Sequence, residues 1–147
     1  MRKFHLIVNE SQLEVMARMA DLYSRIGIGQ LETVAEQLQN NDVGKRLRVD
    51  EHAMGIEALA NALKQASYHF FGVSKGVHRA IDNPELPTRF KDAHDLQQVI
   101  RYALCQAAPE EHVGSIWAYP PHQYSVEALP VCVLVEQAAP IRLKATG

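Results

Sequence analysis

Apolar residues recur at helical spacing along much of the chain, and polar residues fill the positions between them. Residues 13–26 place apolar side chains on a single stripe, and a similar pattern resumes over residues 30–39. Residues 51–67 and 87–105 repeat this spacing, so the pattern predicts a mostly helical chain. The side chains expected to face inward from the first of these helices are Leu13, Met16, Ala20, Tyr23 and Ile26.

Residues that typically begin helices precede these stretches. Asn9 or Ser11 is expected to cap the first helix, and Glu14 stands three residues after Ser11 as in a capping box. Asp50 is expected to cap the helix over residues 51–67. Pro87 suits the first turn of the last helix, where a missing N–H group costs no intrahelical hydrogen bond.

The two ends of the chain carry a different pattern. Residues 4–8 alternate between apolar and polar positions, and residues 131–135 form a nearly continuous apolar run, which residues 141–144 extend. Both patterns are typical of strands, so we expect the N-terminal and C-terminal strands to pair in a small antiparallel sheet. The predicted fold class is α+β, mostly helical, in a single domain over residues 1–147, a length that can bury a core.

Gly27 and Gly29 interrupt the helical pattern between residues 13 and 39. A glycine inside a helix costs about 1 kcal/mol relative to alanine, so each position calls for a reason. Close packing of another helix against the backbone is one explanation, and the approach of a ligand is the other. The sequence leaves both open.

Composition narrows the functional classes. Apolar residues make up 47% and charged residues 22% of the chain, which is usual for a globular protein. The formal net charge of −2 argues against duplex nucleic acid as a partner. Cys105 and Cys132 lie far apart in apolar surroundings, as in reduced cytosolic proteins. No apolar run approaches the ~20 residues of a membrane span, so no membrane partner is expected.

The histidines raise the question of catalysis. His94 and Asp95 resemble the His-Asp pair of metal-dependent phosphohydrolases, for which His52, His69 and His78 would be further ligands. However, the chain contains no H-E-x-x-H, C-x-x-C or G-x-S-x-G pattern. We therefore expect a protein without enzymatic activity, metal or cofactor, with a phosphohydrolase as the third-ranked alternative.

The region from residue 68 to residue 105 has the side chains that a nucleotide needs. Residues 72–86 form a loop longer than most connections, and such loops are often functional. Arginines bind phosphates, aromatic rings stack on bases, and amides bond to base edges. The candidates are Arg79, Arg89 and Arg101 for phosphates, Phe70, Phe71 and Tyr102 for stacking, and Asn83 and Gln98 for base edges.

Two segments add a family resemblance. The run ADLYSRIGIGQLETV (residues 20–34), together with FGV and NPELPTRFKDAHDLQQVIRYAL (residues 71–73 and 83–104), resembles a family of small phage and prophage proteins. That family is similar to the Thoeris anti-defence sponge proteins, which bind cyclic ADP-ribose variants and, in some members, cyclic oligonucleotides without turnover. The resemblance implies ligand-binding roles for Arg25, Phe71, Asn83 and Arg101, and a more speculative one for Arg46.

The chain departs from the family pattern in two places. It inserts SKGVHRAID at residues 74–82, which puts the contacts of this loop, including Arg79, in question. The tail after residue 108 has no counterpart in the pattern.

Taken with the resemblance, the sequence predicts a phage anti-defence sponge that sequesters a cyclic nucleotide signal in the cytoplasm of the infected bacterium. The resemblance also implies a homo-oligomer, a dimer or higher, with the ligand held between protomers. The alternative is a protein-binding inhibitor or regulator of a host defence protein, acting through the aromatic residues of segments 68–71 and 117–124.

Overall fold

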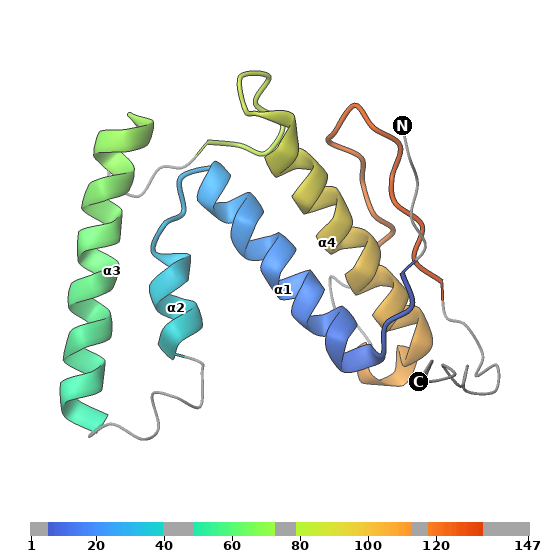
Figure 1. The fold of residues 1–147 in the computed structure, drawn as a ribbon, viewed down its shortest axis with the longest axis horizontal. Coiled ribbons are helices and arrows are strands. Elements are labelled where there is room, and N and C mark those ends of the chain that lie inside the picture. The colour runs from blue at the N-terminus through green and yellow to red at the C-terminus, as the bar shows by residue number, and fades with distance from the viewer. Residues whose placement is uncertain (1–5, 40–48, 73–78, 113–117, 134–147) are drawn as a thin grey trace, which may run out of the picture.

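The protein is built from helices joined by turns and irregular segments. The structure, a computed structural model, describes residues 6–39, 49–72, 79–112 and 118–133 (Figure 1). The helices are α1 (Glu10–Gly27), α2 (Thr33–Gln39), α3 (Val49–Phe71) and α4 (Thr88–Ala107), and the short 3-10 helix η2 (Pro109–His112) follows α4. Within these ranges, no helix combines the length and the apolar character needed to cross a membrane.

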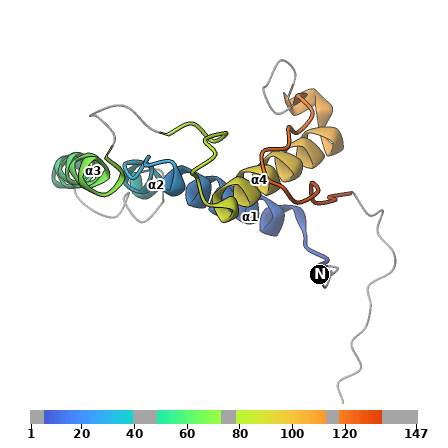
Figure 2. The ribbon, with the colours of Figure 1, turned by 90° about the horizontal axis from the view of Figure 1, so that it is seen from above.

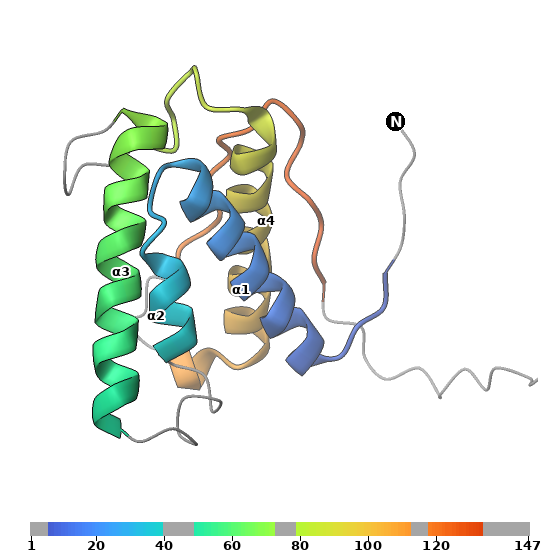
Figure 3. The same cartoon turned by 60° about the vertical axis from the view of Figure 1, so that its left-hand side comes forward.

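The helices lie side by side in the spatial order α3, α2, α1, α4 (Figures 1 and 3). Seen from above in Figure 2, the row is elongated, with α3 at one end and α4 toward the other. Helix α1 packs mainly against α4, and α2 packs mainly against α3. Residues 118–133, which we call the strap, run beside α4 without regular secondary structure (Figure 1).

The predicted α+β fold is wrong, because the described residues contain no β-sheet. Residues 6–8 and 131–133 form no strand, and the remainder of the predicted strands lies outside the described residues. Apolar side chains of both segments are exposed: Leu6 is 68% exposed and Val131 is 87% exposed. Alternation of side chains specifies a strand only where a partner strand and a covering layer exist, and neither is formed in the described part of the chain.

Helix α1 begins at one of the two caps predicted for it. The Oδ1 atom of Asn9 accepts a hydrogen bond from the Gln12 N–H at 2.9 Å, and Gln12 Oε1 accepts one from the Asn9 N–H at 3.0 Å. This is a complete capping box, with Asn9 and Gln12 in the roles expected of Ser11 and Glu14. Two of the backbone donors at the start of the helix are thereby satisfied.

The contact between α1 and α4 is built on small residues of α1. The most buried residues of α1 are Ala17, Ala20, Ser24 and Gly27, of which Ala20 belongs to the stripe predicted to face inward. Ile100 and Leu104 of α4 complete this core with Ala17, and partly buried Leu13, Met16 and Leu96 pack around it. Small side chains let the two helices approach closely, and the predicted inward residue Tyr23 is 44% exposed.

The glycines that interrupt the helical pattern have different structural roles. A Cβ atom at Gly27 would overlap the ring of Phe90, so this glycine allows the start of α4 to pack on the end of α1. Gly29 adopts φ = +92° in the turn that follows, a conformation that residues with a side chain rarely adopt. The buried Ser67 Oγ donates a hydrogen bond to the Gly29 carbonyl and joins α3 to this turn. Of the two explanations left open by the sequence, close packing applies to Gly27.

Candidate functional site: a charged cluster between α1 and α4

One face of α4 carries the polar side chains that define the candidate site. His94, Gln98 and Arg101 are spaced by four and three residues, which places them in a row along one side of the helix. Gln98 is buried, whereas His94 and Arg101 are partly exposed. The row therefore offers an imidazole and a guanidinium group at its two ends, about two helical turns apart.

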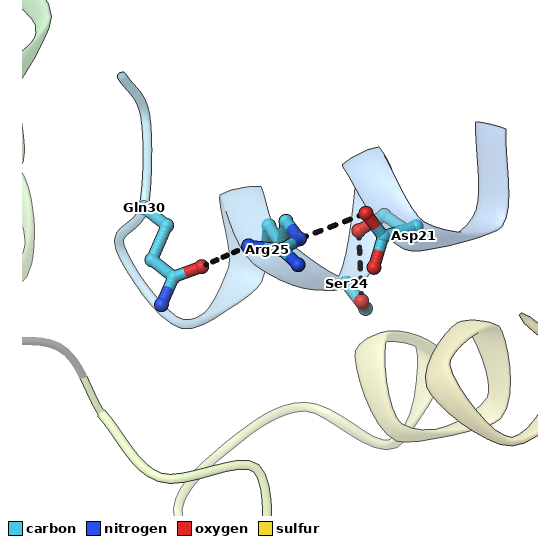
Figure 4. Close-up of polar contacts among 4 residues, drawn as sticks. All are labelled: Asp21, Ser24, Arg25 and Gln30. Atoms are coloured by element: carbon cyan, nitrogen blue, oxygen red, sulfur yellow. Dashed lines mark hydrogen bonds and ion pairs between the residues drawn. The ribbon is translucent and has the colours of Figure 1, made fainter. Parts of the chain in front are cut away.

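Helix α1 brings a second arginine to this face. The Arg25 Nε donates to Asp21 Oδ2 at 2.8 Å, and Arg25 Nη1 donates to Gln30 Oε1 at 3.1 Å (Figure 4). The Arg25 side chain is 43% exposed, so one edge of the guanidinium is oriented by these bonds while solvent still reaches it. Ser24 donates to the Asp21 carbonyl at 2.8 Å and closes the same turn of α1 (Figure 4).

The charges of both helices act on His94. Burial is the main cause that lowers the pKa of His94, and the positive charges of Arg101 and Arg25 lower it as well. The carboxylates of Asp95 and Asp21 act in the opposite direction. Because the net effect is a lowered pKa, His94 is held in its neutral form near pH 7 and can both donate and accept a hydrogen bond.

Arg101 lacks the partners that its burial requires. Its Nε atom is buried and has no hydrogen-bond partner, and no carboxylate in the described part of the chain lies within 4.0 Å of its guanidinium. Buried polar atoms are nearly always paired in folded proteins, and an unpaired donor costs about 1 to 3 kcal/mol. Because the residue as a whole is partly exposed, its guanidinium is a candidate for binding an anion.

The strap closes the same face of α4. The Asp95 carboxylate, only 1% exposed, accepts hydrogen bonds from the backbone N–H of Tyr124 at 3.0 Å and of Ser125 at 2.9 Å. The Ser125 hydroxyl donates to it as well, at 2.6 Å. Gln98 donates to the His122 carbonyl at 3.0 Å and accepts from the His122 N–H at 3.1 Å. Polar side chains of α4 therefore fix the strap at residues 122–125.

Aromatic rings gather where the strap meets α4. The ring centroids of His94 and Tyr124 lie 5.2 Å apart, and those of His122 and Tyr124 lie 4.9 Å apart, both in edge-to-face arrangements. We call these three rings, together with Arg25 and Arg101, whose charges act on His94, the cluster.

The structure brings together only some of the predicted site residues. Arg25 and Arg101, which are far apart in sequence, both act on His94. Phe71 and Arg79 lie at the turn after α1 instead: the Arg79 N–H donates to the Ile28 carbonyl at 2.9 Å, and Arg79 Nη2 donates to the Phe71 carbonyl at 3.2 Å. Arg25 contacts this turn through Gln30.

The remaining predicted residues are engaged elsewhere or have no contact at the cluster. Asn83 Oδ1 accepts from the Glu85 N–H at 2.9 Å in a local turn. Arg89 is exposed and lies over the ring of its neighbour Phe90, 4.9 Å from the ring centroid. Both ends of the Gln98 amide are bonded to His122, so this amide is not free for a base edge. Tyr102 is partly buried on α4, and Arg46 lies outside the described residues.

The geometry around Asp95 also bears on the phosphohydrolase alternative. Both oxygens of its carboxylate are bonded to the strap, so a metal ion would have to displace these donors. Within the described ranges, no group of three or more His, Cys, Asp or Glu side chains is placed to hold a metal ion.

Sequence reasoning considered Tyr124 only within a protein interface and His94 only as a metal ligand, and it did not anticipate the contact between their rings. Tyr124 stands in an irregular, proline-containing segment with no periodic pattern, so nothing in the sequence indicated its position. The spacing of His94 and Arg101 on one helix was the available signal for His94.

Comparison with known proteins adds no further evidence. The chain matches no protein-family model, and no curated protein or solved structure shows significant similarity to it.

Proposed function

We propose that this protein binds a small anionic nucleotide without transforming it and so removes a signal from solution. The observation that carries the proposal is Arg101, whose Nε atom is buried without a hydrogen-bond partner. Its positive charge acts on His94, as does that of Arg25 from another helix. Arginine binds phosphate through paired, charge-assisted hydrogen bonds, and convergence of arginines from separate helices favours a ligand with several phosphate oxygens.

The proposed ligand class is a cyclic nucleotide, either a cyclic ADP-ribose variant or a cyclic oligonucleotide, as the family resemblance implies. The proposed setting is the cytoplasm of a bacterium infected by a phage that carries this protein. A sponge acts by mass action and must hold the free signal below the level that its effector needs. Nanomolar affinity corresponds to about 12 kcal/mol of binding free energy, which several arginine contacts and a stacked base can supply.

Self-association is part of the proposal. Val15, Met19 and Tyr23 stand at intervals of four residues on α1 and are 54%, 65% and 44% exposed. An exposed apolar stripe on a helix of this kind suits burial against a second copy of the chain.

Mass spectrometry under native conditions tests the proposal directly. The purified chain is incubated with cyclic ADP-ribose isomers and with cyclic di- and trinucleotides, and any bound ligand is then released by heat and identified. Recovery of an intact nucleotide supports a sponge, and recovery of a cleaved product supports an enzyme. Binding of none of these nucleotides by the folded chain contradicts the proposal.

A matched pair of variants connects the binding to the site. Arg101→Glu reverses the charge at the cluster and should weaken nucleotide binding by at least about 100-fold, the effect of losing charge-assisted bonds. Arg18→Glu makes the same change on the exposed side of α1, where the Arg18 side chain is 71% exposed and lies 3.7 Å from Glu14. This control should bind as the parent chain does.

A protein-binding inhibitor remains the second candidate, because aromatic side chains are exposed near the end of α3. Tyr68 is 52% exposed and Phe70 is 81% exposed. Aromatic residues are enriched in protein interfaces. Under this alternative, Phe70→Ser would remove the inhibition of a host defence protein while Arg101→Glu would leave it intact.

A further inference from the structure

The strap places an aromatic ring beside the charged cluster. The rings of His94 and Tyr124 are 5.2 Å apart between centroids, and His94 is the residue on which both Arg25 and Arg101 act. Phe71, one of the rings predicted for stacking, packs at Gly29 on the other side of the turn after α1. Tyr124, by contrast, is partly exposed, and its ring contacts the ring of His94.

Hydrogen bonds fix the position of Tyr124 more firmly than burial does. Its backbone N–H donates to Asp95, and the neighbouring backbone at His122 and Ser125 is bonded to Gln98 and Asp95. Apolar side chains elsewhere on the strap contribute little, since Tyr119 is 68% exposed and Val126 is 89% exposed. A binding side chain is effective when neighbouring contacts hold it in place before the ligand arrives.

We propose that Tyr124 is the stacking surface for the base of the bound nucleotide, and that Asp95 and Gln98 are positioning residues that hold it there. This inference rests on the proposed function. It assigns one side chain to the base: the Tyr124 ring, which contacts the ring of His94.

Calorimetric titration with two probes separates stacking from anion binding. Cyclic ADP-ribose carries a base, and inorganic pyrophosphate does not. Tyr124→Leu should weaken binding of cyclic ADP-ribose by about 5- to 100-fold, the effect of losing a stacked base, and should leave pyrophosphate binding within about twofold. Tyr124→Phe keeps the ring and should bind both probes as the parent chain does. Tyr119→Leu, an exposed change on the same strap, is the control.

The positioning role of Asp95 predicts an effect on amide hydrogen exchange that the loss of stacking alone would not cause. Asp95→Ala should weaken cyclic ADP-ribose binding to a similar extent and also speed amide hydrogen exchange at residues 122–125, whereas Tyr124→Leu should change binding without that acceleration. Asp95→Asn retains an acceptor oxygen and should restore part of the affinity. Unchanged exchange in Asp95→Ala would overturn the positioning role.

The outcomes distinguish this inference from the proposed function. If the parent chain binds cyclic ADP-ribose and Arg101→Glu does not, but Tyr124→Leu binds it as tightly as the parent, only the stacking role is overturned. Equal loss of both probes in Tyr124→Leu would also overturn it, because the residue would then act on the whole site. If the folded parent chain binds neither probe and none of the cyclic di- and trinucleotides of the panel, the proposed function and this inference both fail.

Discussion

Phe90 occupies the space that a side chain at Gly27 would need. The ring of Phe90 covers this glycine and also packs on Tyr23, with ring centroids 5.0 Å apart. The start of α4 is thereby fixed to the last turn of α1, next to the turn that carries Gln30, the partner of Arg25. The contact therefore helps to set how α1 and α4 pack against each other.

A methyl group at Gly27 should therefore destabilise the protein. We expect Gly27→Ala to lower the free energy of unfolding by about 1 to 3 kcal/mol, the usual effect of overpacking, in spite of the better helix propensity of alanine. Urea denaturation measures the change. Gly55→Ala on α3 is the control: a Cβ atom there meets nothing within 4 Å, so its effect should be neutral or stabilising. Equal stability of the two variants would contradict the packing role.

Removal of the Ser67 hydroxyl should loosen the connection between α3 and the turn after α1. Ser67 is 5% exposed, and its hydroxyl bonds to the Gly29 carbonyl. Ser67→Ala leaves that carbonyl without this donor and should lower the free energy of unfolding by about 1 to 2 kcal/mol. Thermal unfolding measures it, with the exposed Ser11→Ala as control. A loss no greater than that of the control would show that the bond contributes nothing.

The stability of the protein should depend on pH through His94. Its folded pKa lies below the ordinary value of 6.5, so the unfolded chain takes up a proton more readily than the folded chain does. The contribution of neutral His94 is complete above pH 6.5 and is lost as the pH falls from there toward the lowered pKa. Unfolding measured over this range should show a smaller pH dependence in His94→Gln than in the parent chain. The same pH dependence in His94→Gln and in the parent chain would show that His94 is not the group responsible.

Arg101 should limit stability while it enables binding. Because its Nε is buried without a partner, Arg101→Met should keep the packing of the alkyl chain and raise the free energy of unfolding by about 1 kcal/mol. The same variant should lose nucleotide binding, because residues that serve a function often do so at a cost in stability. Denaturation and calorimetric titration of one preparation measure both effects. A marked loss of stability would instead assign Arg101 a structural role.

The apolar stripe of α1 should mediate self-association. Met19→Lys introduces a charge at the centre of this stripe and should shift the chain to a lower oligomeric state in size-exclusion chromatography with light scattering. Met54→Lys is the control, since Met54 is 73% exposed on α3. The same mass for the parent chain and for Met19→Lys would exclude the stripe as the interface.

The candidate site was only partly predictable. Arg101 stood out because arginines in a polar helix face suggest phosphate binding, and Arg25 was indicated by the family resemblance. Gln98 was predicted to read a base edge, yet its amide holds the backbone of His122. Which atoms an amide bonds to depends on the segment that arrives beside it, and the strap is 24 residues away in sequence.

The sequence by itself determined the helices, because apolar periodicity, the capping residues near Asn9 and the glycine break after residue 26 act within a few residues of each other. The tertiary structure decided the rest. Strand patterns at the chain ends formed no sheet in the described residues, since a strand depends on a distant partner for its hydrogen bonds. The meeting of Arg25, His94, Arg101 and Tyr124 likewise required α1, α4 and the strap to pack together, which no local pattern specifies.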